Sequence, residues 1–434
     1  MRQIRFALSL VIAMAAAFSS AQAAHATTLE QQLEELQKVV SQLQEVVARQ
    51  EQQLAEQATI IKGVQNQMNP PELAKEIEPH IDKHLLHERS GVGEQIGNLR
   101  VAVGLTGTVQ GSIDAEEVSG EDSDQTDGSW SMDVELEAPI GESGLAFMLI
   151  EAAQGEGLTD ELGSLYHSVN DDAGGTESRL EVTEAWYEHS FREGRVLLAA
   201  GKLDMTNYFD TNAVANDERF QFLNSAFVNS IAVEFPEDNG AGIRLAAYPS
   251  DWLGLGLGWA ESDADWEDIA NDGFAIAEVN LKPNFAGKEG NYRLYGWMNA
   301  SDKEKLRGSG THENGWGVGL SFDQKLTESL TAFLRAGYED DDVYPVEATW
   351  STGAQIQGTR WNRENDMLGF AVSQAILNDA VEPDDTETLL EAYYSIAVNE
   401  HLFVSPDIQI IDNPSGDNDN DTVFVLGARA QVNF

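Results

Sequence analysis

The chain has 434 residues, no cysteine, and 74 acidic against 26 basic residues, for a formal net charge of −48. The lack of cysteine excludes a disulfide framework and thiolate metal sites, and the acidic balance excludes a nucleic-acid-binding protein, which would carry a basic patch. The excess of carboxylates has two interpretations. It favours cations at a pore mouth through electrostatic focusing, or it only solvates exposed loops.

The first residues predict an exported protein. Arg2 and Arg5 precede an uncharged run over residues 6–18, and small residues follow it. This order is typical of a signal peptide, which we assign to residues 1–23, with a second candidate cleavage site at residue 26. The run is too short for a transmembrane helix of about 20 residues. No later segment is long and apolar enough to be one, so a membrane location would depend on strands.

Residues 27–68 have the pattern of a coiled coil. Apolar residues and two glutamines keep a 4-3 spacing, with Gln, Glu and Lys at most positions between them. The predicted core positions are Leu29, Leu33, Leu36, Val40, Leu43, Val47, Gln50, Leu54, Gln57, Ile61, Val64 and Met68. The pattern predicts an oligomerisation stalk or a periplasmic spacer that binds a periplasmic partner. The alternative is a single amphipathic helix that lies on the rest of the protein.

A proline-bounded helical linker is predicted over residues 69–96, because Pro70 and Pro71 end the preceding helix. His80, His84 and His87 share one face of this linker. Histidines spaced i, i+4 can chelate Zn²⁺ or Cu²⁺. No fourth ligand is evident, and an exposed polar surface explains the cluster equally, so we predict no metal site and no cofactor.

From residue 97 the period of the pattern changes from 3.5 to 2. In the last segment, for example, apolar residues share one face while Arg429, Gln431 and Asn433 share the other. We count about 16 such runs, several of them near the length that a tilted strand needs to cross a bilayer. Acidic, turn-rich segments separate them. The pattern predicts an all-β fold over residues 97–434, a transmembrane antiparallel β-barrel of about 16 strands that follows the coiled coil.

A soluble β-sandwich would alternate too, but three features favour the barrel. The polar face is charged or glycine-rich, and the last strand runs to the final residue, Phe434. Aromatic residues near strand ends resemble the interfacial girdles of membrane barrels, as at Trp130, Trp259 and Tyr292. An open sheet edge is not viable in lipid, so the strands must close.

Several stretches resemble the carbohydrate-selective porin (OprB) family. They are residues 201–204 (Gly-Lys-Leu-Asp), 208–212, 221–227, 291–297, 390–394, 405–409, 412–414 and 426–434. The resemblance implies a 16-stranded barrel in the bacterial outer membrane through which small sugars diffuse passively. It also implies contact with outer-membrane lipid and a homo-oligomer, of which a trimer is the form expected by analogy with porins. The coiled coil would then lie in the periplasm.

A porin selects solutes by pore diameter, lining groups and electrostatic barriers. For a sugar, an aromatic ring packs against the C–H face while charged groups reach the hydroxyls. The inward faces of the predicted strands supply candidate substrate-binding residues, namely Arg293, Tyr295, Trp297, Glu391, Tyr393, Asp407 and Arg429. The alternative is that these groups pair among themselves and only stiffen the wall.

A long segment rich in Asn, Asp and aromatic residues, 206–227, could fold inward and narrow the lumen. The candidate constriction residues in and near it are Lys202, Asp204, Phe209, Asp210 and Asn224. The alternative is an ordinary extracellular loop, or a turn and a strand.

No catalytic motif stands out. The chain has no Gly-x-Ser-x-Gly elbow, P-loop, dinucleotide fingerprint or His-Glu-x-x-His motif, so we predict that it is not an enzyme. Two functions stay open beside sugar diffusion. One is a porin for siderophores or small cations. The other is a barrel that tethers the outer membrane to another envelope layer through the coiled coil, with transport secondary.

Overall fold

The computed structural model describes residues 93–115, 118, 125–162, 165–174, 179–267, 269–270, 272–308, 310–312 and 314–434. The predicted signal peptide, coiled coil and histidine cluster, and most of the predicted linker, lie outside the described residues. No helix among the described residues has the length and apolar character needed to cross a bilayer.

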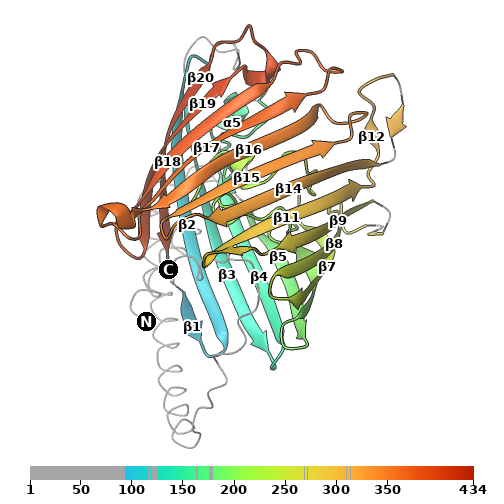
Figure 1. Ribbon diagram of the computed structural model, residues 1–434, viewed down its shortest axis with the longest axis vertical. Coiled ribbons are helices and arrows are strands. Elements are labelled where there is room, and N and C mark those ends of the chain that lie inside the picture. The colour runs from blue at the N-terminus through green and yellow to red at the C-terminus, as the bar shows by residue number, and fades with distance from the viewer. Residues whose placement is uncertain are drawn as a thin grey trace, which may run out of the picture. The chain divides into compact units, whose positions relative to one another are not determined.

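Sixteen long antiparallel strands form one closed sheet (Figure 1). They are β2 (Leu99–Ile113), β3 (Thr126–Ile140), β4 (Gly144–Gln154), β5 (Arg179–Phe191), β6 (Val196–Leu203), β7 (Gly240–Ser250), β8 (Leu253–Glu261), β9 (Gly273–Leu281), β11 (Lys288–Asn299), β14 (Gly315–Lys325), β15 (Leu330–Glu339), β16 (Val346–Gln357), β17 (Met367–Leu377), β18 (Glu387–Ala397), β19 (Leu402–Asp412) and β20 (Val423–Asn433). Each strand pairs with its neighbours along the chain. The first and last strands, β2 and β20, pair from Gly104↔Asn433 to Ile113↔Phe424 and close the barrel. The predicted barrel of about 16 strands is confirmed.

Short elements complete the fold. The strand β1 (Glu94–Ile96) pairs with β2, so the sheet begins three residues before the predicted boundary at 97. The strand β10 (Asn284–Phe285) pairs with β11, and β12 (Lys303–Glu304) pairs with β13 (Thr311–His312). The helical turns are α5 (Leu158–Glu161), α6 (Ser225–Val228), η2 (Gly358–Trp361) and η3 (Pro414–Gly416).

Burial along the strands is the inverse of that in a soluble protein. On β2 the polar side chains of Thr106, Thr108 and Gln110 are buried inside the barrel, whereas Leu105 and Val109 are exposed on the outer face. On β20, Arg429 is 1% exposed and Leu426 is 49% exposed. A barrel in lipid needs this arrangement, because the hydrocarbon phase takes the apolar face and the lumen takes the polar one.

Strand connections differ in length between the two ends of the barrel. One end has short turns such as residues 141–143 and 251–252, and the other has long segments. The longest, which connects β6 to β7 over residues 204–239, is called the inner loop here. Most of its side chains from Tyr208 to Val233 are buried, and the polar groups that bond to it lie on the inward faces of strands. The inner loop therefore lies inside the barrel.

Glycines on β8 make room for the inner loop. The ring of Phe209, which is 1% exposed, lies against Gly256 and Gly258. A Cβ atom at these positions would come within 3.0 Å and 2.5 Å of the ring, respectively. Because residues two apart face the same side of a strand, the Leu-Gly alternation of β8 presents its glycines to the lumen. The two glycines thus leave space at the barrel wall for the ring of Phe209.

The substitution Gly258→Ala should displace Phe209 and destabilise the barrel by about 1–3 kcal/mol, the usual cost of overpacking. The measurement is the temperature at which the barrel loses its heat-modifiable mobility in detergent gels. The matched control is Gly254→Ala on the same strand, where a new Cβ meets its nearest neighbour at 3.4 Å, an ordinary contact. Equal transition temperatures for the two variants would show that the glycine does not seat the ring.

Candidate functional site

One buried guanidinium holds three points of the inner loop. Arg335 on β15 is 1% exposed, and its Nε lies 3.0 Å from a carboxylate oxygen of Asp210. Its terminal nitrogens donate to the backbone carbonyls of Asp210 at 2.8 Å, Ala215 at 3.0 Å and Phe227 at 3.3 Å. Arginine suits this position because its rigid fork of donors can bind a carboxylate and several carbonyls at once.

Asp210 is the matching anion, and it is fully buried. Its carboxylate accepts hydrogen bonds from the Tyr295 hydroxyl at 2.9 Å and the Ser230 amide at 2.7 Å. Its own amide donates to Glu278 of β9 at 3.2 Å. Burial raises the pKa of Asp210, and Arg335 opposes that shift. The residue thus links the inner loop to β9, β11 and β15.

The middle of the inner loop, residues 218–226, is hydrogen-bonded to the last strands. Glu391 of β18 accepts from the amides of Leu223 at 2.6 Å and Asn224 at 3.0 Å. The Asn224 side chain donates to Gln409 of β19 at 3.0 Å and accepts from the Ala226 amide, capping α6. Arg429 of β20 donates to the carbonyls of Glu218 and Gln221, the latter at 2.9 Å.

All seven predicted substrate-binding residues face inward and are buried. Tyr295, Glu391 and Arg429 hold the inner loop as described above, and the Trp297 indole donates to the carbonyl of Ala232 at 2.9 Å. These four contact a loop that fills part of the lumen. Their contact with a sugar stays a prediction.

The other three predicted residues contact the wall or pack under the inner loop. Arg293 pairs with Asp323 at 2.9 Å and lies 4.0 Å from Glu278. The Tyr393 hydroxyl accepts from Gln355 at 2.7 Å, and its ring packs edge-on against Phe222 of the inner loop. Asp407 accepts from Gln409 at 3.1 Å. The seven residues thus bind other residues of the wall and of the inner loop, and a role in binding a solute stays a prediction.

The predicted constriction residues separate into two groups. Asp204, Phe209, Asp210 and Asn224 belong to the inner loop. Lys202 does not, because it precedes the inward-facing Leu203 on β6 and so lies on the opposite face of that strand. There its Nζ donates to the carbonyl of Val182 at 2.9 Å.

Two cavities lie on the opposite side of the lumen, between the inward faces of β3 to β5 and the inner loop where it leaves β6; together they are called the path here. A cavity of about 330 Å³ lies there. Its apolar side consists of Phe147 and Trp186, which stack with ring centroids 4.9 Å apart, and of Tyr208 from the inner loop. A second cavity of about 470 Å³ shares Glu151, Asp171 and Glu218 with the first, so the two cavities adjoin.

Carboxylates dominate the polar side of this path. Among the described residues that line the first cavity, seven are acidic and one is an arginine. The acidic residues are Glu135, Glu151, Asp171, Glu184, Asp204, Asp217 and Glu218. The arginine, Arg219, pairs with Asp133 of β3 and lies 3.5 Å from Glu218. The path therefore has an excess of acidic groups, and its potential is negative where they are ionised.

Burial and neighbouring negative charges change the titration of two carboxylates in the path. Asp171, which lines both cavities, and Asp172, which lines the second, lie in the connection between β4 and β5, outside the membrane-spanning strands. Burial raises the pKa of Asp171 to about 7 and that of Asp172 to about 8, and the negative charge of Glu218 adds to both shifts. Ser131 donates to Asp172 at 2.8 Å, which opposes the shift of that residue.

Apart from Asp204, the acidic lining was not among the predicted site residues, although β3 carries a signal for it. Asp133, Glu135 and Glu137 occupy consecutive inward positions of that strand and are buried. An unbroken acidic face on a lumen strand indicates a charged pore wall. The inner-loop residues that line the same cavities have no such signal, because they come close to β3 only when the loop folds into the lumen.

The sequence matches the carbohydrate-selective porin, OprB family, over residues 120–434. The chain belongs to this family. This OprB-family chain has the fold of Pseudomonas putida OprB in its high-pH structure, with a TM-score of 0.70 and 17% identity over 78% of this chain and 94% of that chain. With the low-pH structure of that protein the TM-score is 0.53. The family and the fold are those of porins of the bacterial outer membrane, which are channels rather than enzymes.

Curated relatives match part of the chain. An uncharacterized protein of Aquifex aeolicus is 27% identical, over 54% of this chain and 63% of its own. The putative porin QuiX of Acinetobacter baylyi is 23% identical, over 58% and 69%. Porin AaxA of Chlamydia abortus is 22% identical, over 60% and 58%. The chain thus spans less than two thirds of the Aquifex and Chlamydia proteins.

The substitution Arg335→Met should loosen the inner loop and raise single-channel conductance and current noise in planar bilayers. It leaves Asp210 buried without its cation, an arrangement that costs about 3–5 kcal/mol. The double variant Asp210→Asn/Arg335→Met should recover part of that loss, because no lone charge remains.

Arg360→Met serves as the control, since Arg360 is an exposed arginine in η2 that donates to Ser329. It should leave conductance unchanged. Wild-type conductance and noise in Arg335→Met would show that other bonds suffice to hold the loop.

Proposed function

We propose that this porin lets small carbohydrates diffuse passively across the outer membrane along the path between β3–β5 and the inner loop. One observation supports this most directly. Three aromatic side chains and a set of carboxylates line the same 330 Å³ cavity. The family to which the chain belongs points to the same class of solute.

The lining suits a sugar because it offers two kinds of contact. The faces of Trp186 and Tyr208 can pack against pyranose C–H groups, and carboxylates such as Glu151 accept hydrogen bonds from hydroxyls. Glu184 is already oriented, since it accepts from the Trp186 indole at 2.9 Å and from Asn207 at 2.9 Å. The inner loop sets the width of the path, and the buried residues of β11, β15 and β18–β20 act by holding it in place.

Purified mature protein in liposomes should give faster swelling with glucose and arabinose than with uncharged non-sugar solutes of the same size. Trp186→Ala should reduce the sugar rates by about two- to ten-fold, the worth of one aromatic contact. The control is Trp316→Ala, which removes an indole that is 45% exposed on the outer face of β14. Swelling that follows size alone would remove the sugar preference, and no swelling would remove the pore.

A second function, permeation of small cations, is favoured by the seven acidic residues and one arginine that line the first cavity. A narrow, low-dielectric path lined by one sign of charge concentrates ions of the opposite sign. Ion selectivity of this kind is compatible with the passage of neutral sugars, because a sugar uses the same carboxylates as hydrogen-bond acceptors.

The triple variant Glu151→Gln/Asp171→Asn/Glu218→Gln should lower the ratio of potassium to chloride permeability several-fold, measured as the reversal potential in a KCl gradient at about pH 9, where the raised pKa of Asp171 still leaves that group ionised. The control removes three carboxylates from the connection between β19 and β20, as Asp417→Asn/Asp419→Asn/Asp421→Asn. Equal effects of the two variants would assign the selectivity to overall charge rather than to the path.

The reversal potential can also be measured as a function of pH. The raised pKa values of Asp171 and Asp172 mean that both carboxyl groups lose their protons as the pH rises from 6 to 9. Cation selectivity of the wild-type protein should therefore increase over this range, and the increase should be smaller in the triple variant, which lacks Asp171. A flat wild-type profile would contradict the placement of these groups in the ion path.

Three further parts of the proposal concern partners. The exposed outer face, with residues such as Leu105, Leu294 and Phe370, suits contact with outer-membrane lipid. A homo-oligomer, with a trimer expected, stays a prediction. So does the role of the coiled coil as a stalk, spacer or tether, because it lies outside the described residues.

A further inference from the structure

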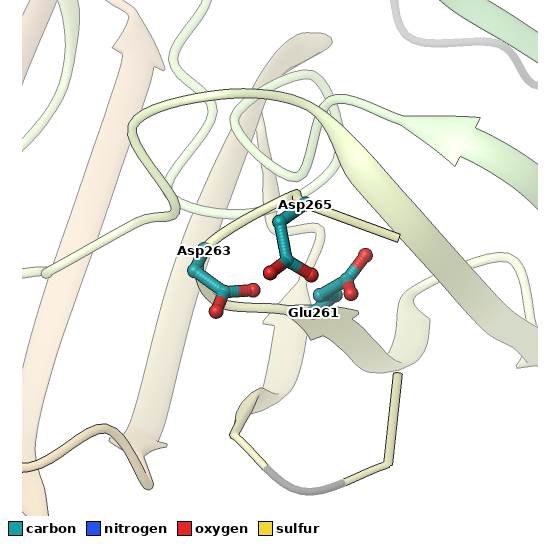
Figure 2. Close-up of side chains that lie close together, drawn as sticks. All are labelled: Glu261, Asp263 and Asp265. Carbon is teal, nitrogen blue, oxygen red and sulfur yellow. The ribbon is translucent and has the colours of Figure 1, made fainter. Parts of the chain in front are cut away.

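Three carboxylates converge where β8 ends and its connection to β9 begins. Figure 2 shows the side chains of Glu261, Asp263 and Asp265 turned toward a common point. Each residue offers an oxygen that lies within 4.8 Å of those of the other two. The backbone at Ala264 and Trp266 has φ angles of 52° and 63°, so the chain bends sharply at this cluster.

The buried carboxylate of Glu261 points to a ligand. The residue is 1% exposed, and its Oε1 atom has no hydrogen-bond partner. Its other oxygen lies 3.5 Å from the Ala241 amide, a long contact. A buried carboxylate oxygen without a partner is costly, because the desolvation of its charge is not repaid.

Within the part of the chain that the structure describes, no basic side chain forms an ion pair with Glu261. The ion pairs among those residues include none of the three carboxylates. Asp263 and Asp265 are instead exposed, so the cluster opens to solvent on one side and is closed by Glu261 on the other. A cation from solution can therefore reach it.

We propose that Glu261, Asp263 and Asp265 bind a Ca²⁺ ion. Calcium takes carboxylate, carbonyl and water oxygens at about 2.3–2.6 Å, so two oxygens on one ion lie at most about 5 Å apart. The spacing of up to 4.8 Å fits that limit. Mg²⁺ demands near-ideal octahedral geometry and usually keeps several of its waters, so a partly open set of three carboxylates suits Ca²⁺ better.

The ion would remove the repulsion among the three carboxylates and tie the connection after β8 to the barrel wall. Water molecules would complete the coordination on the open side. Since only one ligand is buried, the expected dissociation constant is that of solvent-facing sites, about 10⁻⁴–10⁻³ M. This inference does not depend on which solute the pore carries, because none of the three residues lines the path beside β3–β5.

Terbium luminescence tests the site in the full mature protein in detergent micelles. Tb³⁺ has the coordination preferences of Ca²⁺, and Trp266, adjacent to Asp265, is placed to sensitise it. Excitation of tryptophan should give Tb³⁺ emission that CaCl₂ displaces at millimolar concentration and MgCl₂ displaces at least ten-fold less well. Asp263→Asn/Asp265→Asn should lose this emission, and Glu261→Gln should weaken Ca²⁺ binding by at least ten-fold.

The matched control is Asp417→Asn/Asp419→Asn. That pair has the same spacing, and the Asp419 amide donates to Asp417 at 2.9 Å, much as the Glu267 amide donates to Asp265 at 2.6 Å. It should leave the emission unchanged. Trp266→Phe should lose the emission while calorimetry still detects Ca²⁺ binding, which assigns the signal to this site.

Two results would overturn the proposal. One is emission that survives in Asp263→Asn/Asp265→Asn, since the ion would then lie elsewhere, for example at the pore carboxylates beside Trp186. The other is a lack of displacement by 10 mM CaCl₂. Because Asp263 and Asp265 are exposed, their replacement by asparagine should leave folding intact, and an unchanged heat-modifiable mobility would verify this.

Discussion

The buried ion pair between Arg335 and Asp210 is the interaction on which the architecture of the lumen depends. A barrel of sixteen strands encloses more space than side chains alone can fill, and here a chain segment occupies part of it. That segment carries many backbone polar groups out of bulk water, and each needs a partner. Arg335 satisfies three carbonyls and a carboxylate of the inner loop from a single position on the wall.

The distribution of these bonds explains why the path lies where it does. The inner loop is bonded to β9, β11, β14 and β15 through residues such as Asp210 and Thr211, and to β18, β19 and β20 through residues such as Gln221 and Asn224. On the side of β3 to β5 the contacts are fewer, and the adjoining cavities lie there. The loop is held against one side of the barrel and leaves the other side open, so pore width is a consequence of bonds made at a distance from the path.

Most of the positive charge inside the barrel is likewise used to hold the structure. Four arginines on inward faces of strands, Arg244, Arg293, Arg335 and Arg429, are each buried, and they bind carboxylates or loop carbonyls. Among the described residues that line the first cavity, Arg219 is the one basic side chain, and its charge is matched by Asp133. Positive charge is thereby used to hold the structure together, and the open path keeps an excess of carboxylates. The acidic character of the path follows from where the arginines are used, in addition to the composition of the chain.

The sequence by itself determined the barrel. Strict alternation, as on β2 and β20, has to place one face in lipid and the other in the lumen, and this decided the strands, their inward residues and the family. It could not decide what the inward residues contact. Tyr295, Glu391 and Arg429 are correctly placed inside the barrel by their period, but their partners lie in a segment far away in the chain. Arg335 was not singled out, since one arginine in an alternating strand has no distinctive pattern. Only the tertiary structure brings the inner loop against these side chains. It also separates the residues that hold the loop from those that line the path, because this separation depends on which side of the lumen the loop occupies.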